Sequence, residues 1–344
     1  MPEIKLYTVV QIREWLMNNK PAEGLSEQVI APTRAWAIIH NPYVKDNDAI
    51  VAAIFEDGEL AAYTASFPDK LDGQRVWWAS TLYCYPQFAG RGYGMIVVGA
   101  LMEAHGTELT YDRWGASETV EIFNHFGYNT IYTHRCHMSN KKIDSSSLKG
   151  KIASCIQELK KCFYTWPEQS KADYTLRYTS YVDGEAYAFM QQNRGSDLWL
   201  REQDMLNWIL RYPIRQGCTI PTRVEKDLYF TSNTDTYSYQ VIKVYIDNKL
   251  IGVYILRQNG DTLAIVYVYW KSEHKDIAFA SIVDHIIAIR PNKLTLDDKE
   301  LYMYVHKHVY YPKMHEEKVS FSIPADMTPL KNYSLQFGDG DSFI

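Results

Sequence analysis

The chain has 344 residues, more than one ordinary α/β unit needs and enough for two domains. Its formal net charge of −5 argues against a general attraction to nucleic acid or to anionic lipid. No apolar run approaches the roughly 20 residues of a membrane span, and the first residues lack the layout of a signal peptide. Five cysteines without a Cys-x-x-Cys pair favour reduced thiols. We therefore expect a cytoplasmic protein with neither nucleic acid nor a membrane as a partner.

The first part of the chain alternates between helical and strand patterns. Apolar residues at helical spacing predict one helix over residues 8–19 and another over 26–40, in which Pro32 is a kink or a boundary. Further along, the pattern predicts strands over 50–55, 60–67 and 76–85, a helix over 95–105, and strands over 107–111 and 129–137. Two helices and a three-stranded meander therefore precede the first strongly apolar helix.

A glycine-rich turn joins the third strand to that apolar helix. Gly90, Gly92 and Gly94 remove side chains from the turn, so an anion can approach the backbone N–H groups. The helix N-terminus behind the turn adds partial positive charge. No Gly-Lys-Ser/Thr follows, and the flanks lack a repeated βαβ pattern, which argues against a Walker loop and a dinucleotide fold. The turn predicts a phosphate cradle, with a tight strand-to-helix connection as the plain alternative.

The residues around the turn carry a family resemblance. Cys84-Tyr85-Pro86, followed by Gly92 and Gly94, resembles the strand end and acyl-CoA pyrophosphate loop of the GCN5-related N-acetyltransferases, with Ala89 where the family prefers Arg or Gln. An offset reading from Gln87 restores that residue but breaks the spacing from the proline. Residues 118–128 resemble the helix and exit turn that follow in the family. The resemblance covers roughly residues 50–134.

This resemblance implies a fold, a donor and a reaction. The fold would be α/β (α+β), with a mixed, mostly antiparallel sheet flanked by helices. The reaction would be direct transfer of an acetyl group from acetyl-CoA, as co-substrate, to a primary amine of a small molecule or peptide in a ternary complex, with no metal. The residues that the family pattern assigns to the acyl-CoA site are Cys84, Ala89, Gly90, Arg91, Gly92, Tyr93, Gly94 and Phe123.

The catalytic positions of the family are poorly matched. Its usual Tyr acid falls on Phe123, its Asn on Ala116, and residues 75–87 contain no carboxylate to act as base. These departures leave a second hypothesis open, a non-catalytic CoA-binding or scaffold protein. The intact loop glycines favour the enzyme.

Three side chains are candidates for proton transfer. Tyr83 and Tyr85 alternate with Cys84 along a strand and so face the opposite side of the sheet, although Tyr is also a common packing residue there. Asp112 lies at a probable strand end, where a solvated carboxylate is the plain alternative. Cys84 is better read as a small buried hydrophobe than as a nucleophile.

One further spacing invites a metal site. His134 and Cys136 would share a face of a strand, but His137 would not, and no second ligand cluster follows. We therefore expect no metal.

The rest of the chain repeats the first part in outline. We predict a first domain over 1–138, a linker with a helix (148–164) over 139–172, and a second domain of the same fold over 173–344. The repeat consists of helices at 185–193, 202–211, 277–290 and 300–308, and strands at 239–246, 250–257, 262–270 and 293–296.

The repeat is degenerate where the first part has its glycine turn. Residues 271–276 contain no glycine, and Glu273 and Asp276 would repel a pyrophosphate. Only the first half should therefore bind acyl-CoA, and the second should shape the acceptor site or be structural. No residue pattern indicates an oligomeric state.

Residues 333–344 admit two interpretations. They are a flexible acidic tail, or residues 333–337 are a last strand that places Asp339 and Asp341 near a domain interface, where they would bind a cationic amine acceptor or accept its proton.

Overall fold

The computed structural model describes residues 2–113, 115–140, 147–164, 173–211, 237–325 and 334–340. We call residues 2–140 the first half and residues 173–340 the second half. The elements of the first half are β1 (Glu3–Thr8), α1 (Val9–Asn18), α2 (Pro32–Ile39), β2 (Ala49–Glu56), β3 (Glu59–Leu71), β4 (Gln74–Cys84), the 3₁₀ turn η1 (Pro86–Phe88), α3 (Tyr93–His105), β5 (Thr110–Arg113), α4 (Ser117–His125) and β6 (Tyr128–Ser139).

The second half repeats this order, as the sequence predicted. After the connecting helix α5 (Leu148–Tyr164) come β7 (Thr175–Thr179), α6 (Gly184–Gln192), α7 (Gln203–Arg211), β8 (Tyr237–Ile246), β9 (Lys249–Asn259), β10 (Thr262–Trp270), η2 (Ser272–His274), α8 (Lys275–Ile289), β11 (Lys293–Leu296), α9 (Lys299–His308) and β12 (Lys313–Pro324). The two halves are therefore an α/β repeat, and the predicted linker helix matches α5. None of the helices within these ranges is long and apolar enough to cross a membrane.

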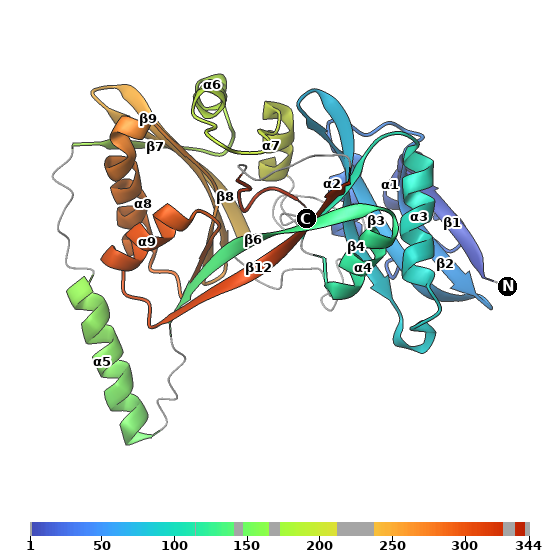
Figure 1. Ribbon diagram of the computed structural model, residues 1–344, viewed down its shortest axis with the longest axis horizontal. Helices are drawn as coiled ribbons and strands as arrows, with labels where there is room; N and C mark the ends of the chain where they lie inside the picture. Colours follow the sequence, from blue (N-terminus) through green and yellow to red (C-terminus); the bar gives the residue numbers. More distant parts are fainter. Residues whose placement is uncertain are drawn as a thin grey trace.

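The described strands form one continuous twelve-stranded sheet. Its order is β1-β2-β3-β4-β5-β12-β6-β11-β10-β9-β8-β7, and only β4–β5 and β10–β11 pair in parallel. The last strand of each half pairs with a strand of the other half. In this way β6 pairs with β11 of the second half, and β12 pairs with β5 of the first half. Between them β6 and β12 run antiparallel from Lys313↔Ser139 to Pro324↔Tyr128, and Figure 1 shows them crossing between the halves. The predicted boundary at residue 138 therefore lies at the end of a shared strand, and the domain division stays a prediction.

Local chemistry explains where the first helices begin. Thr8 caps α1 through a capping box with Gln11, which ends β1 and starts the helix in the same residue. Pro32 is at the first position of α2, where its missing N–H costs nothing. The predicted helix over 26–40 is therefore shorter, and Pro32 is its boundary and not a kink within it.

The two faces of the sheet are covered differently. On one face α3 packs on β2 and β3, where Ala52, Ala61 and Ala62 are small enough to let the helix approach. On the other face, Trp199 from the loop before α7 packs edge-on against Trp78 and Tyr111, with ring centroids 5.5 and 5.4 Å apart. The second half thus contributes to the core of the first half.

Candidate functional site

The glycine turn shapes the N-terminus of α3. Gly90 and Gly92 have φ of 78° and 75°, in the left-handed region that favours glycine, and Gly92 is the N-cap of α3. The first bond within the helix runs from the Ile96 N–H to the Gly92 carbonyl, so the three amides before Ile96 have no acceptor in the helix. A Cβ at either glycine would meet nothing within 4 Å, so backbone conformation, and not crowding, requires glycine there. The turn presents three N–H groups at a helix N-terminus.

The other residues of the turn are held by neighbours. The Arg91 guanidinium forms an ion pair with Glu56 at the end of β2 and lies 5.4 Å from the Phe88 ring centroid. The Tyr93 side chain is buried, and a Cβ at Gly94 would lie 3.3 Å from Ile122 of α4. Tyr93 and Gly94 therefore offer only their backbone groups to a ligand.

Beside the turn, β4 has an open edge. It pairs with β5 only at Trp77↔Thr110 and Trp78↔Tyr111, although it continues to Cys84. A bulge at Thr81, whose φ is 50°, reorients the strand beyond that point. The Tyr85 N–H bonds to Ala61 of β3, so the preceding amide, of Cys84, faces the edge that β5 has left. The amide of Cys84, and not that of Tyr83, is therefore directed at the open edge.

The Cys84 thiol has no mark of a nucleophile. Burial raises its pKa, and its Sγ lies 3.9 Å from the carbonyl oxygens of Tyr85 and Phe88. At Cys84 the functional group on offer is therefore the backbone amide.

Tyr83 and Tyr85 lie together near this edge. Their ring centroids are 5.0 Å apart, and Tyr63, opposite Tyr83 on β3, makes a third member at 5.8 Å from Tyr83. Burial, followed by the neighbouring tyrosines, raises the pKa of Tyr63 to about 12, and burial raises the pKa of Tyr85. Both phenols are therefore protonated at neutral pH and can donate a proton or a hydrogen bond. Tyr63 was missed because only the strand register brings it here.

The predicted Asp112 lies elsewhere. Tyr111 packs on the Trp78 side of the sheet, so Asp112 faces the other side. There it is 5% exposed and lies opposite Ser322 of β12, and a Cβ at Gly115 would come within 2.4 Å of its Oδ2 atom. The structure does not bring Asp112 into the tyrosine cluster.

Phe123 is part of the core. Its side chain is 0% exposed and its ring centroid lies 5.2 Å from that of Tyr128, in an edge-on contact. The residue that matches the family's tyrosine acid is therefore buried, with no side-chain surface for a ligand.

The expected histidines and cysteine on β6 have other partners. His137 Nε2 lies 2.9 Å from Glu317 and Nδ1 lies 3.1 Å from Thr295, while burial raises the pKa of Cys136 to about 11. Within the described ranges, no cluster of His, Cys, Asp or Glu is arranged to hold a metal.

The second half has no counterpart of the glycine turn. In the first half residues 89–92 separate η1 from α3, but η2 ends at His274 and α8 begins at Lys275. The turn that presents amides in the first half is therefore absent from this connection.

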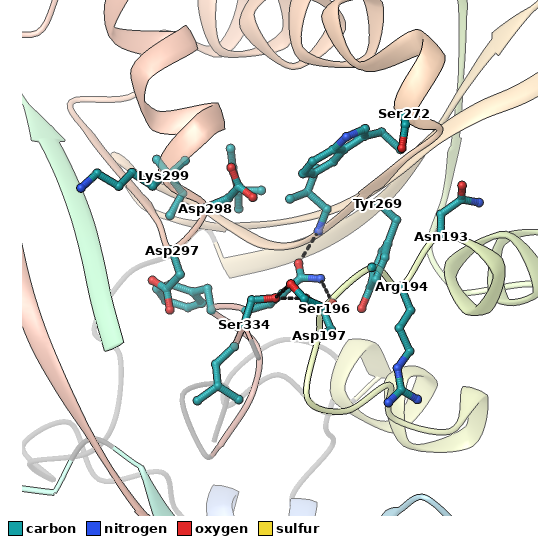
Figure 2. A pocket seen from close by; sticks show the side chains of 18 residues that line it. Asn193, Arg194, Ser196, Asp197, Tyr269, Ser272, Asp297, Asp298, Lys299 and Ser334 are labelled. Carbon is teal, nitrogen blue, oxygen red and sulfur yellow. Dashed lines mark hydrogen bonds between the residues drawn. The ribbon is translucent and has the colours of Figure 1, made fainter. Parts of the chain in front are cut away.

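The second half instead holds a cavity of about 450 Å³, where the ends of β10 and β11 separate. In Figure 2, Asp297, Asp298 and Lys299 come from one side and Asn193 and Arg194 from the other. Asp297 is paired with Arg113 at 2.8 Å and Arg135 at 2.9 Å, and Asp298 caps α9. The carboxylates of this wall are therefore engaged by protein groups.

Comparison with known proteins identifies the architecture. No family model and no curated protein matches the sequence. Among solved structures, the chain is similar to a probable N-acyltransferase from Enterococcus faecalis (TM-score 0.52, 14% identity, 97% of this chain and 75% of that chain). It is also similar to a putative acetyltransferase from Pyrococcus horikoshii (0.51, 10%, 99% and 95%) and to a tandem GNAT protein from the clavulanic acid biosynthesis pathway (0.50, 9%, 96% and 100%). At these identities the likeness establishes the fold alone. The chain has the fold of the GCN5-related N-acetyltransferases, present twice in tandem.

Proposed function

We propose that the chain transfers an acetyl group from acetyl-CoA to a primary amine of a small molecule or peptide, with the donor bound in the first half. The observation that supports this most strongly is the left-handed Gly92 cap, which leaves three amides of α3 free of helix acceptors beside the open edge of β4. Oriented N–H groups at a helix N-terminus bind phosphate without side-chain charge. The turn would therefore hold the pyrophosphate of the donor.

Each group of the site has a role in this proposal. The Cys84 amide, which faces the open edge, would donate a hydrogen bond to the thioester carbonyl. The amine nitrogen bonds to the carbonyl carbon, the carbon–sulfur bond breaks, and the leaving thiolate takes a proton from Tyr83 or Tyr85. The proton lost by the amine goes to solvent, because Asp112 is buried on the other face of the sheet. The raised pKa of Tyr85 suits an acid and not a base.

Specific observations favour a second candidate, CoA binding without catalysis. Phe123 is buried where the family pattern has its tyrosine acid, and β4 contains no carboxylate. A binding protein needs the amides of the turn but neither of those groups.

One pair of measurements separates the two functions. Acetyl-CoA is titrated into the full chain by calorimetry, and amine acceptors (amino sugars, polyamines and peptide N-termini) are screened with acetyl-CoA by mass spectrometry. Saturable binding together with an acceptor gaining the mass of an acetyl group supports the enzyme. Binding without turnover on any acceptor supports the second candidate, and no binding at all refutes both.

A further inference from the structure

The carboxyl-terminal segment Ser334–Gly340 lies on the open edge of the second half. β10 pairs with β11 only from Thr262 to Ala264, and beyond a bulge at Val266 its edge has no strand partner among the described residues. The Gly338 N–H donates to the Val266 carbonyl at 2.9 Å, and the Val268 N–H donates to the Gln336 side chain at 2.7 Å. The edge of β10 that corresponds to the open edge of β4 is therefore occupied by residues of the same chain.

The start of the segment is fixed by backbone bonds. The Leu198 N–H donates to the Ser334 carbonyl at 2.9 Å, and the Ser334 N–H donates to the Ser196 carbonyl at 2.8 Å. Figure 2 shows Ser334 beside Ser196 and Asp197, and the Ser334 hydroxyl lies 2.7 Å from the Asp197 carboxylate. This end of the segment borders the cavity.

The middle of the segment fits a shaped site. The Phe337 ring lies between the guanidinium groups of Arg135 and Arg257, at 3.9 and 4.8 Å from its centroid. Gly338 packs so closely that a Cβ would lie 2.3 Å from the Tyr267 ring and 2.7 Å from Val266. The contacts therefore favour an aromatic residue at 337 and require glycine at 338, where any larger residue would clash.

Two buried arginines hold the backbone of the segment. Arg113 of β5 donates to the carbonyls of Gln336 and Asp339, and Arg201 donates to the carbonyls of Gly338 (2.9 Å) and Gly340 (2.7 Å). The Asp339 carboxylate accepts the Gln336 N–H at 2.8 Å and the Tyr267 hydroxyl at 3.4 Å. Arg113, Arg201 and Asp339 are at most 2% exposed. The interpretation of the tail as flexible is therefore wrong for residues 334–340, which lie between the halves, and Asp339 is not available to an amine. Asp341 lies outside the described residues.

We propose that the second half is a peptide-binding module whose ligand is the carboxyl-terminal segment of its own chain. An extended peptide that adds to a free strand edge is recognised by main-chain bonds along the edge and by pockets for its side chains. The chemistry recognised here is an aromatic residue, a glycine and an acidic residue in succession, Phe337-Gly338-Asp339. Because Gln336 takes the Val268 N–H, the segment also closes this edge to any other extended ligand.

The test uses the full chain with Gly338→Ala, which should expel the segment because of the clash with Tyr267. A fluorescein-labelled peptide of residues 334–344 should then bind this variant saturably, measured by fluorescence anisotropy, and at least tenfold more weakly to the wild type, whose site is filled. Gly184→Ala is the matched control, since a Cβ there meets nothing within 4 Å, and it should behave as the wild type. Unlabelled peptide should compete, whereas the same peptide with Gly338→Ala should compete at least tenfold less well.

A second variant guards against misfolding. Phe337→Ala removes the ring between the two guanidiniums without adding a clash, and it should also bind the labelled peptide; circular dichroism and the Tm show which variants are folded. Failure of both folded variants to bind would overturn the proposal, and so would binding of the labelled peptide by the wild type and Gly184→Ala as tightly as by Gly338→Ala. If Gly338→Ala does not fold, Phe337→Ala alone decides. No step uses acetyl-CoA, so the result is independent of the proposed acetyl transfer.

Discussion

The pyrophosphate site can be tested with one pair of isosteric substitutions at the N-cap of α3. Gly92 has φ 75° and ψ 10°, a conformation that Asn and Asp tolerate better than other side chains. A Cβ at this position meets nothing within 4 Å, so both side chains have room. Gly92→Asn and Gly92→Asp therefore carry a similar backbone cost and a similar shape, and they differ by one negative charge.

The charge acts where the donor phosphates would approach. An Asp carboxylate at the N-cap lies next to the amides of the first helical turn and, as a cap, accepts a hydrogen bond from one of them. Two like charges roughly 5 Å apart at an effective dielectric constant of about 40 repel by about 1.7 kcal/mol. A pyrophosphate carries two such charges, and screening at physiological salt reduces the sum, so we expect a net difference of about 2 kcal/mol. This corresponds to roughly 30-fold weaker CoA binding for Asp than for Asn.

Calorimetric titration of CoA into both variants measures this difference directly. It should shrink when the salt concentration is raised, because the repulsion is between exposed charges. Thermal unfolding is the control, and the Asp variant should be no less stable than the Asn variant, since both residues are good caps. Equal CoA affinity in two folded variants would show that the pyrophosphate does not bind at this turn.

Further predictions concern catalysis and the contact between the halves. Of Tyr83→Phe and Tyr85→Phe, the one that removes the acid should lower kcat by about 10²–10⁴-fold with little change in CoA affinity, in steady-state kinetics with an identified acceptor. Arg201 pairs with Asp69 at 2.8 Å in a buried site, so Arg201→Met should cost about 3–5 kcal/mol in chemical denaturation, and adding Asp69→Asn should recover part of it. Burial raises the pKa of Asp339 from 3.8 to about 6. The folded protein therefore holds this proton more tightly than the unfolded chain. The stability that this bound proton contributes is fully present below about pH 4 and is lost as the pH rises through 6. Across this window the free energy of unfolding should fall by about 3 kcal/mol relative to that of Asp339→Asn. If urea titrations show the same difference in unfolding free energy between the wild type and Asp339→Asn at every pH in this window, the pKa of Asp339 is not raised by folding.

The sequence predicted the elements that local patterns define. Helix α5 and the apolar helices α3 and α8 carry their own periodicity, and the glycine turn is contained in a few residues. The strands β1, β7 and β12 were missed. In β12 residues 313–318 are exposed, so the first part of the strand has no apolar alternation. Its paired residues in β5 and β6 are about 170 to 210 positions earlier in the chain, and no local pattern reports such a pairing.

The same distinction applies to the candidate site. The turn around Gly92 was predicted because the glycines that its backbone conformation requires lie close together in the sequence. Tyr63 was not, because a bulge at Thr81 sets which residue of β3 lies opposite Tyr83. The burial of Asp339 depends on Arg113 and Arg201, each more than a hundred residues earlier in the chain. Hydrogen bonds from these distant guanidinium groups to backbone carbonyls hold the acidic segment in a buried position.

The two halves share a fold but differ at both features that the proposed donor site requires. The first half has residues 89–92 between its 3₁₀ turn and α3, and no other described segment bonds to the Cys84 amide. The second half lacks these residues, and Gln336 occupies the Val268 amide. Because the second half has no turn that could hold phosphate, an open strand edge there would not contribute to donor binding. A buried strand edge whose backbone groups lack hydrogen-bond partners also costs free energy. Filling it with the chain's own segment satisfies those backbone groups and joins the halves through Arg113 and Arg201. Under the proposed function, CoA should therefore bind with a stoichiometry of one per chain.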